Sequence, residues 1–181
     1  LMQELNQADF QSASWSLLFR PDPFLSEAAR GVAERKKSLS VYEVNFHTTR
    51  GDAPLDLRNQ VVAGAASGPA LAQRLLEAMA LGVRRQCVYS LAQFDTALPD
   101  NGGFLKLWGV ARDLGVTGRL RPTGLAMAML NQALPADVYP VKISGDDAGS
   151  LTGMAFRNPA GWQVALVSGA SRPVEFCVTV S

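Results

Sequence analysis

Hydrophobic and polar positions along the first two thirds of the chain divide it into short apolar runs and longer amphipathic stretches. The apolar runs, at about 15–19, 40–46 and 86–91, have the length and composition of β-strands. Stretches 26–37 and 67–82 follow the first two runs and space their apolar residues as helices do. This order predicts a βα repeat, in which a parallel sheet is connected by helical crossovers.

The first predicted helix, 26–37, has polar residues suited to both of its ends. Ser26 can cap the first turn, and the Glu27 carboxylate favours the positive end of the helix dipole. Lys36 and Lys37 suit the negative end. We therefore expect this helix to begin at about Ser26.

A polar loop, 47–59, leads from the second strand into the second helical region. Ser67 and Pro69 mark a fresh helix start there. Leucine and methionine side chains then recur at i, i+4 spacing up to Gly82: Leu71, Leu75 and Met79. The sequence thus predicts a helix over 67–82.

Two further helices are expected after the third strand. The segment "FLKLWGVARDLG", 104–115, is predicted as a short helix, and "RPTGLAMAMLNQAL", 121–134, as a longer one. Pro122 fits the first turn of the longer helix, and Pro135 ends it because proline cannot continue a helix.

The pattern changes after residue 137. Four short β-rich runs, 137–144, 151–158, 161–169 and 173–181, are separated by Gly, Asp, Asn and Pro turns, which is typical of an antiparallel sheet or part of a sandwich. We place a boundary near 134–137, with an α/β domain over 1–134 and a β-rich domain over 137–181.

Composition excludes several classes of protein. The chain has 181 residues, 48% hydrophobic and 18% charged, with a net charge of +1. It carries no basic excess or Lys/Arg block, so no nucleic-acid partner is expected. The longest weakly charged stretch, 61–73, is shorter than the ~20 apolar residues that span a bilayer, so no membrane span is expected.

The two cysteines, Cys87 and Cys177, each lie in an apolar strand-like run. We expect two buried free thiols, although a disulfide stays possible if their Cα atoms lie within about 7 Å. One histidine and two separated cysteines make a zinc site improbable, and we expect neither metal nor cofactor.

Polar side chains interrupt the second strand near its end. Glu43 lies among apolar residues, and Asn45 and His47 follow it at period two, which places Tyr42 on the opposite face with Val44. Parallel-sheet proteins place their chemistry at the carboxyl ends of strands, where such a carboxylate could act as nucleophile, acid or base. A structural alternative pairs Glu43 with an arginine, for which the candidates are Arg20, Arg50 and Arg85. For His47 the alternative is a hydrogen bond to a backbone carbonyl.

The end of the third strand offers a second polar group. Gln93 could bind a hydroxyl, Phe94 could supply an apolar platform, and Asp95 could act there or cap the next turn. Trp108 is a candidate stacking surface, with burial in an amphipathic helix as the alternative.

These residues resemble a known family of enzymes. The run "VYEVNFHTT", followed about 45 residues later by "CVYSLAQFD", then by "LWGVARD", "RPTGLAMAMLN" and a β-rich tail, is similar to the C-terminal part of clan A glycoside hydrolases. The nearest likeness is to xylosidase- and arabinofuranosidase-like enzymes, in which a β-sandwich follows a (β/α)8 barrel.

The resemblance implies an α/β fold that contains the last strands and helices of such a barrel. Runs 15–19, 40–46 and 86–91 would be strands six, seven and eight. Glu43 would be the nucleophile, and the expected sugar contacts are Tyr42, Asn45, His47, Gln93, Phe94 and Trp108. The family is often exported, which favours a secreted or periplasmic location by resemblance only.

One departure from the family decides what this chain can do. The family's acid/base glutamate follows an asparagine at the end of strand four, and this chain contains neither that pair nor strands one to five. Retaining hydrolysis needs two carboxyl groups. We therefore expect the chain alone to be inactive, and to be a portion of a longer hydrolase or to associate with the missing part of the barrel or with itself. A first residue of Leu1, ahead of Met2, agrees with a piece of a longer polypeptide.

Two other interpretations stay open. In one, the protein is a non-catalytic carbohydrate-binding or accessory protein, with Trp162 and Phe156 as stacking residues of the β-rich tail. In the other, it is a small free-standing α/β domain of unnamed activity, which would be a stable monomer with cooperative unfolding.

Overall fold

The computed structural model describes residues 2–4, 18–19, 22–44, 47–50, 52–92, 94–97, 103–107 and 109–179, and these form a mixed α/β arrangement of helices and small sheets. Three two-stranded sheets and one three-stranded sheet lie within these ranges, and no closed barrel forms from them. Of the predicted strand 15–19, only Leu18 and Phe19 are described, and neither is in a strand.

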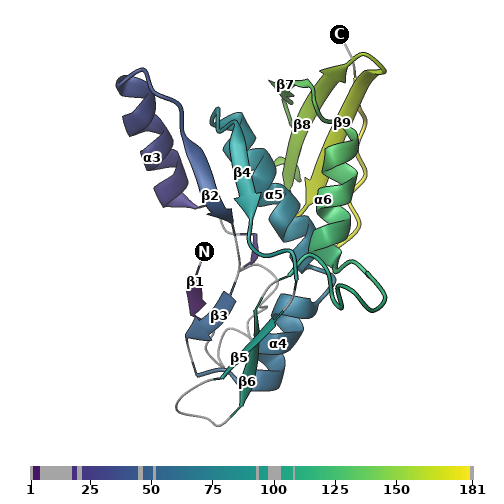
Figure 1. The fold of residues 1–181 in the computed structure, drawn as a ribbon. Helices are drawn as coiled ribbons and strands as arrows, with labels where there is room; N and C mark the ends of the chain where they lie inside the picture. Colours follow the sequence, from purple (N-terminus) through teal and green to yellow (C-terminus); the bar gives the residue numbers. More distant parts are fainter. Residues whose placement is uncertain are drawn as a thin grey trace.

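A parallel strand pair confirms the predicted crossover. Strand β2 (Ser40–Val44) lies beside β4 (Arg85–Val88), and the chain between them includes the helices α4 (Leu55–Ala63) and α5 (Ser67–Ala80) (Figure 1). Both strands run in one direction, so their carboxyl ends meet at the same edge. The helix expected over 67–82 begins at Ser67 as predicted and ends at Ala80, two residues earlier.

The register between β2 and β4 is irregular, and this changes which side chains of β2 are exposed. Val41 pairs with Gln86 and Val44 pairs with Val88, so β2 holds one residue more than β4 between these pairs. A strand accommodates such an extra residue by a bulge, which redirects side chains. Val44 packs against the main core, whereas Tyr42 is 87% exposed. The expectation that the strand is buried on both faces, with Tyr42 facing the same layer as Val44, is wrong for this reason.

Helix α3 (Pro23–Glu34) begins earlier than its polar residues predicted. Its cap is Asp22, whose side chain accepts hydrogen bonds from the backbone N–H groups of Phe24 and Leu25. Proline occupies the first helical position, where its missing N–H costs nothing. Ser26 and Glu27 consequently lie inside the helix, and Lys36 and Lys37 lie beyond its end.

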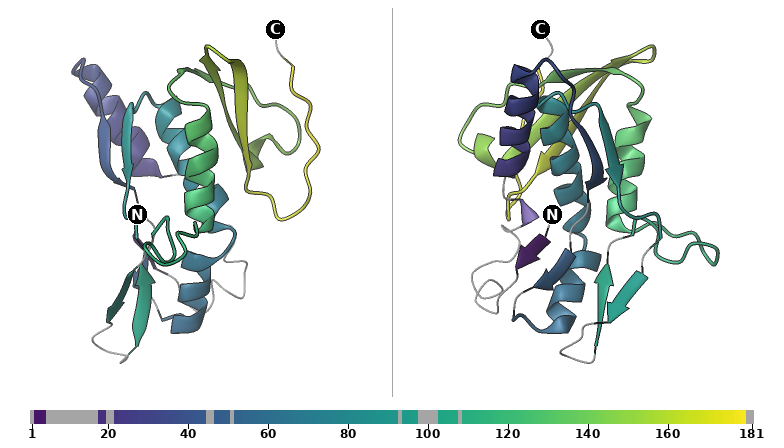
Figure 2. Two further views of the ribbon diagram at one scale, coloured as in Figure 1. Left: turned by 45° about the vertical axis from the view of Figure 1, so that its right-hand side comes forward. Right: turned by 60° about the vertical axis from the view of Figure 1, so that its left-hand side comes forward.

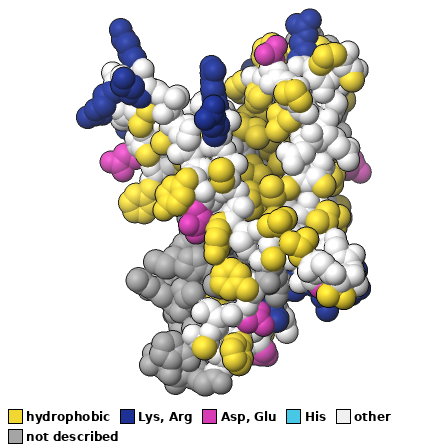
Figure 3. Space-filling model, in the orientation of Figure 1, with side chains coloured by type: hydrophobic (Ala, Val, Ile, Leu, Met, Phe, Trp, Pro, Cys, Tyr) yellow, Lys and Arg dark blue, Asp and Glu magenta, His cyan; other side chains and the backbone are white. Residues whose placement is uncertain are grey.

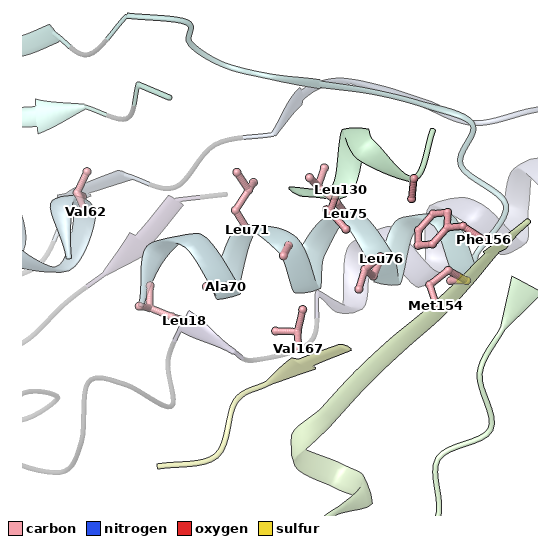
Figure 4. Packing of buried hydrophobic residues seen from close by; sticks show 12 residues of the cluster. Leu18, Val62, Ala70, Leu71, Leu75, Leu76, Leu130, Met154, Phe156 and Val167 are labelled. Carbon is pink, nitrogen blue, oxygen red and sulfur yellow. The ribbon is translucent and has the colours of Figure 1, made fainter. Parts of the chain in front are cut away.

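Helix α5 is the centre of the core. Most of its residues from Ser67 to Leu76 are buried, and they include Leu71 and Leu76. Two buried polar side chains on this helix bond locally, since the Ser67 hydroxyl donates to the Gly64 carbonyl oxygen and Arg74 pairs with Glu77. A third, Gln73, donates from its amide nitrogen to Glu77 and to the distant Phe19 carbonyl oxygen. Figure 4 shows α5 side chains packed against Leu130, Met154, Phe156 and Val167 from other elements.

A three-stranded antiparallel sheet follows in sequence. It contains β7 (Asp137–Pro140), β8 (Leu151–Asn158) and β9 (Gly161–Ser168), which confirms the antiparallel arrangement for three of the four predicted strands. Helix α6 (Pro122–Gln132), which begins at Pro122 as predicted, lies with α5 on one side of this sheet (Figure 2). The predicted boundary near 134–137 lies between α6 and this sheet in sequence, and α5 and β8 on its two sides share one hydrophobic cluster.

The fourth predicted strand is wrong for the described residues. Residues 173–179 have no regular secondary structure and run along the other side of the sheet from α6 (Figure 2). Cys177 in this segment and Cys87 in β4 are both free and exposed, so the expected burial of the thiols is also wrong. Cys87 is exposed because Gln86 and Val88, its neighbours in the alternating strand, face α5.

Candidate functional site

Glu43 lies one residue before the end of β2, and its carboxylate faces solvent. The residue is exposed, and neither a hydrogen bond nor an ion pair engages its side chain among the residues that the structure describes. Of the three arginines considered as partners, Arg85 is described without an ion pair to Glu43. Arg20 and the side chain of Arg50 lie outside the described part. Glu43 thus lies at a strand end as predicted, and its alternative pairing with Arg85 does not form.

Aromatic side chains gather where β4 ends. The backbone N–H of Tyr89 donates to the carbonyl oxygen of Val44 at 3.1 Å, which joins the end of β4 to the residue after Glu43. The Tyr89 ring meets Phe94 edge to face, with ring centroids 6.2 Å apart. Tyr89 and Phe94 are 45% and 41% exposed, so both can contact a ligand. Figure 3 shows hydrophobic side chains spread over the middle of this face of the molecule.

The segments that follow the two strands form a lobe beyond their carboxyl ends (Figure 1). After β2 come β3 (His47–Arg50), which pairs with β1 (Met2–Glu4), and then α4. After β4 comes the hairpin of β5 (Phe94–Ala97) and β6 (Phe104–Leu107). Residues 104–107 were expected in a helix and are instead a strand, because they pair with β5 at every position.

One side chain ties the two halves of this lobe together. The Asn59 amide nitrogen on α4 donates to the Phe104 carbonyl oxygen at 3.2 Å, and its oxygen accepts from the Lys106 N–H at 2.8 Å. The side chain therefore satisfies a donor and an acceptor of the β6 backbone, as a neighbouring strand would. This places the hairpin after β4 beside the helix after β2.

A buried arginine fixes the turn between β3 and α4. Arg58 is 4% exposed, its Nε donates to the Ala53 carbonyl oxygen at 2.7 Å, and an Nη donates to the Thr48 carbonyl oxygen at 3.3 Å. These bonds link α4 to the chain that leaves the end of β2. Neither Arg58 nor Asn59 is recognisable from the sequence, since both look like ordinary polar residues of a surface loop.

The structure describes only part of the predicted site. Glu43, Tyr42 and Phe94 are described and exposed. Asn45, Gln93 and Trp108 lie outside the described residues, and of His47 only the backbone is described. Tyr89 is not among the predicted site residues, because it lies inside the strand predicted over 86–91, whereas β4 ends at Val88.

Two acids near the hairpin have partners of their own. Asp95 on β5 lies 3.5 Å from the Lys106 ammonium across the hairpin, so the two form a cross-strand ion pair. The turn that Asp95 could cap lies outside the described residues. Asp113 accepts a hydrogen bond from the Thr117 hydroxyl, and that bond lowers the pKa of the Asp113 carboxyl. Burial lowers the pKa of the neighbouring Arg121 guanidinium.

Metal-binding clusters and membrane-spanning helices are both absent from the described ranges. Within them, no three His, Cys, Asp or Glu side chains come together in a way that could hold a metal ion. None of the helices there combines the length and apolar character that crossing a bilayer requires.

Neither the family models nor the curated proteins compared with this chain match it.

Proposed function

We propose that this chain is a portion of a retaining glycoside hydrolase in which Glu43 is the nucleophile. The observation that carries the proposal is the position of Glu43, at the carboxyl end of a parallel strand whose core-facing neighbour, Val44, packs against the main hydrophobic cluster. The carboxylate is exposed and carries no partner among the described residues. Tyr89 and Phe94, at the end of the adjacent strand, provide apolar surface for a sugar ring.

The proposed setting is a (β/α)8 barrel in which β2 and β4 are strands seven and eight. Each of these strands has one paired edge in the described part of the chain, which leaves the other edge open to a further strand. An open parallel pair exposes unpaired backbone groups and apolar side chains. The partner that fits these edges is the remaining part of the barrel, supplied by the same polypeptide or by association.

The reaction assigns a defined role to each carboxyl group. Glu43 would attack the anomeric carbon and form a glycosyl ester as the bond to the leaving oxygen breaks. A second carboxylic acid, about 5 to 5.5 Å away, would protonate that oxygen and then deprotonate the attacking water. The second acid belongs to the remaining part of the barrel.

The test is covalent trapping in the native gene product. A 2-deoxy-2-fluoro glycoside with a good leaving group slows the second step, so a retaining enzyme accumulates the ester on its nucleophile. We expect labelling of the peptide that contains Glu43, and a loss of kcat of at least about a thousandfold in Glu43→Gln. Glu34→Gln, an exposed glutamate on α3, is the matched control and should keep full activity.

The same experiment can contradict the proposal. A label on another carboxylate, or full activity in Glu43→Gln, would exclude Glu43 as the nucleophile. Hydrolysis by the 181-residue chain alone would show that the second acid lies within it, and would overturn the assignment of that acid to the remaining barrel.

A further inference from the structure

The two faces of the β7–β8–β9 sheet have different surroundings. Met154 and Phe156 on β8 face the helices, and each residue is buried, with an exposed fraction of 1%. Phe156 is therefore a core residue, which corrects its assignment as a stacking residue. Ala155 and Arg157 alternate with these positions and face away from the helices.

Two aromatic rings from the outer strands lie across this second face. Tyr139 on β7 pairs with Ala155 on β8. Trp162 on β9 lies diagonally across from the same Ala155. The ring centroids of Tyr139 and Trp162 are 5.2 Å apart although β8 runs between their strands. The small side chain of Ala155 leaves room for this approach. Tyr139 is 40% exposed and Trp162 is 51% exposed, so the pair forms a partly open aromatic surface.

Charged groups border this aromatic pair. Asp137, Arg157 and Trp162 occupy one row across the three strands. The Arg157 guanidinium carbon lies 5.8 Å from the centre of the Trp162 ring. Within the described residues, neither Asp137 nor Arg157 forms an ion pair or a side-chain hydrogen bond, so a donor and an acceptor remain available beside the rings.

We propose that Tyr139, Trp162 and Arg157 form a surface that binds a sugar unit of a glycan, separate from Glu43. The C–H face of a pyranose would stack on the exposed aromatic surface, with Arg157 donating to a hydroxyl oxygen and Asp137 accepting from a hydroxyl group. The choice of a glycan rests on the proposed hydrolase function, because a second sugar surface would hold the polymer on which that site acts.

Charge favours a sugar over a second protein layer. The buried centres of protein interfaces are depleted of Asp, although Arg, Tyr and Trp are common there, and an unpaired buried carboxylate is costly. Asp137 and Arg157 would both lose water beneath a protein layer, whereas a sugar supplies hydroxyl partners to each. The C-terminal segment already contacts the far end of this face, where Leu151, Leu166 and Phe176 line a shallow pocket, and leaves Trp162 half exposed.

Affinity electrophoresis of the 181-residue chain in gels containing arabinoxylan, linear arabinan or no glycan tests this surface. We expect one of the glycans to slow the chain, and Trp162→Ala or Tyr139→Ala to weaken the retardation constant by roughly tenfold, as loss of a stacked ring does elsewhere. Phe24→Ala, at a 78% exposed aromatic on α3, is the matched control and should migrate as the unchanged chain does. Circular dichroism and thermal melting of each variant show whether it is folded, and Trp162→Phe should retain part of the binding.

The outcomes separate this inference from the proposed function. Retardation that persists in folded Trp162→Ala and Tyr139→Ala but disappears in Glu43→Gln would place the glycan at the strand ends, overturning this inference while supporting a site at Glu43. No retardation by either glycan would overturn it as well, without bearing on covalent labelling of Glu43. Self-association in size-exclusion chromatography that Trp162→Ala abolishes, without glycan binding, would assign the surface to a protein contact instead.

Discussion

The backbone N–H of Tyr89 lies 3.1 Å from the carbonyl oxygen of Val44, which extends the parallel pairing of β2 and β4 past the last residue of β4. Glu43 directly precedes Val44, so this hydrogen bond sets the separation between the carboxylate-bearing strand and the aromatic end of its neighbour. A rigid strand pair can hold a reactive group in place better than a loop can. The candidate site therefore lies on a hydrogen-bonded strand pair, and several of its predicted contacts lie outside the described residues.

Asn59 should control the stability of the β5–β6 hairpin. Asn59→Ala removes both hydrogen bonds to the β6 backbone, each worth about 1 kcal/mol. We expect hydrogen–deuterium exchange at the Lys106 amide to become at least about tenfold faster, because the hairpin opens locally more easily. Gln60→Ala, at the exposed neighbouring position, should leave the rate unchanged. Equal exchange rates in Asn59→Ala and the unchanged chain would show that the side chain does not hold the hairpin.

Gly68 should tolerate no side chain, because α5 and α6 approach closely there. A Cβ at this position would lie 2.5 Å from the Pro122 carbonyl oxygen, and backbone atoms cannot move aside as a flexible side chain can. Gly68→Ala should lower the free energy of unfolding by roughly 1–3 kcal/mol, measured by urea denaturation. Gly149→Ala has open space around the new methyl group and is the control. A stability loss of similar size in both variants would argue against the close approach.

The start of α3 can be tested with two single substitutions. Asp22→Ala removes the cap, which should cost about 1 kcal/mol and speed amide exchange at Phe24 and Leu25. Ser26→Ala lies inside the helix, where alanine has the higher helix propensity, and should leave exchange unchanged or slower. The reverse ranking of the two variants would restore Ser26 as the cap.

Phe156 should couple the sheet to α5. Its side chain is buried in the cluster that contains Leu71 and Leu76, so Phe156→Ala should lower the free energy of unfolding by about 3–5 kcal/mol. Hydrogen exchange should then increase in α5 as well as in β8, since both contribute to one core. Val164→Ala, on the opposite face of the sheet and 39% exposed, should cost much less. Faster exchange confined to 137–179 would instead support two independent domains.

Local patterns predicted the elements whose signals lie within a few residues. The i, i+4 spacing of Leu71 and Leu75 and the proline at 122 identified α5 and the start of α6, because helix formation depends on neighbours one turn away. The alternation of strand and helix also predicted the parallel pairing of β2 with β4. The first helix is also predicted, but it is capped by Asp22 and not by Ser26, and Pro23 at the first helical position marks that start.

The remaining features depend on partners far away in the sequence. Residues 104–107 became a strand because β5 pairs with them, and a four-residue apolar run alone does not distinguish a strand from a helix. The exposure of Tyr42 depends on the irregular register against β4, which no pattern within β2 encodes.

The sequence by itself determined the mixed α/β character, the main helices and the place of Glu43 near a strand end, since these follow from short-range periodicity and turn residues. Only the tertiary structure decided that Tyr89 joins Phe94 beside that strand end, that Phe156 is buried, and that Trp162 meets Tyr139 on the outer face of the sheet. These contacts arise when segments distant in sequence pack together, and one-dimensional spacing carries little information about which faces will meet.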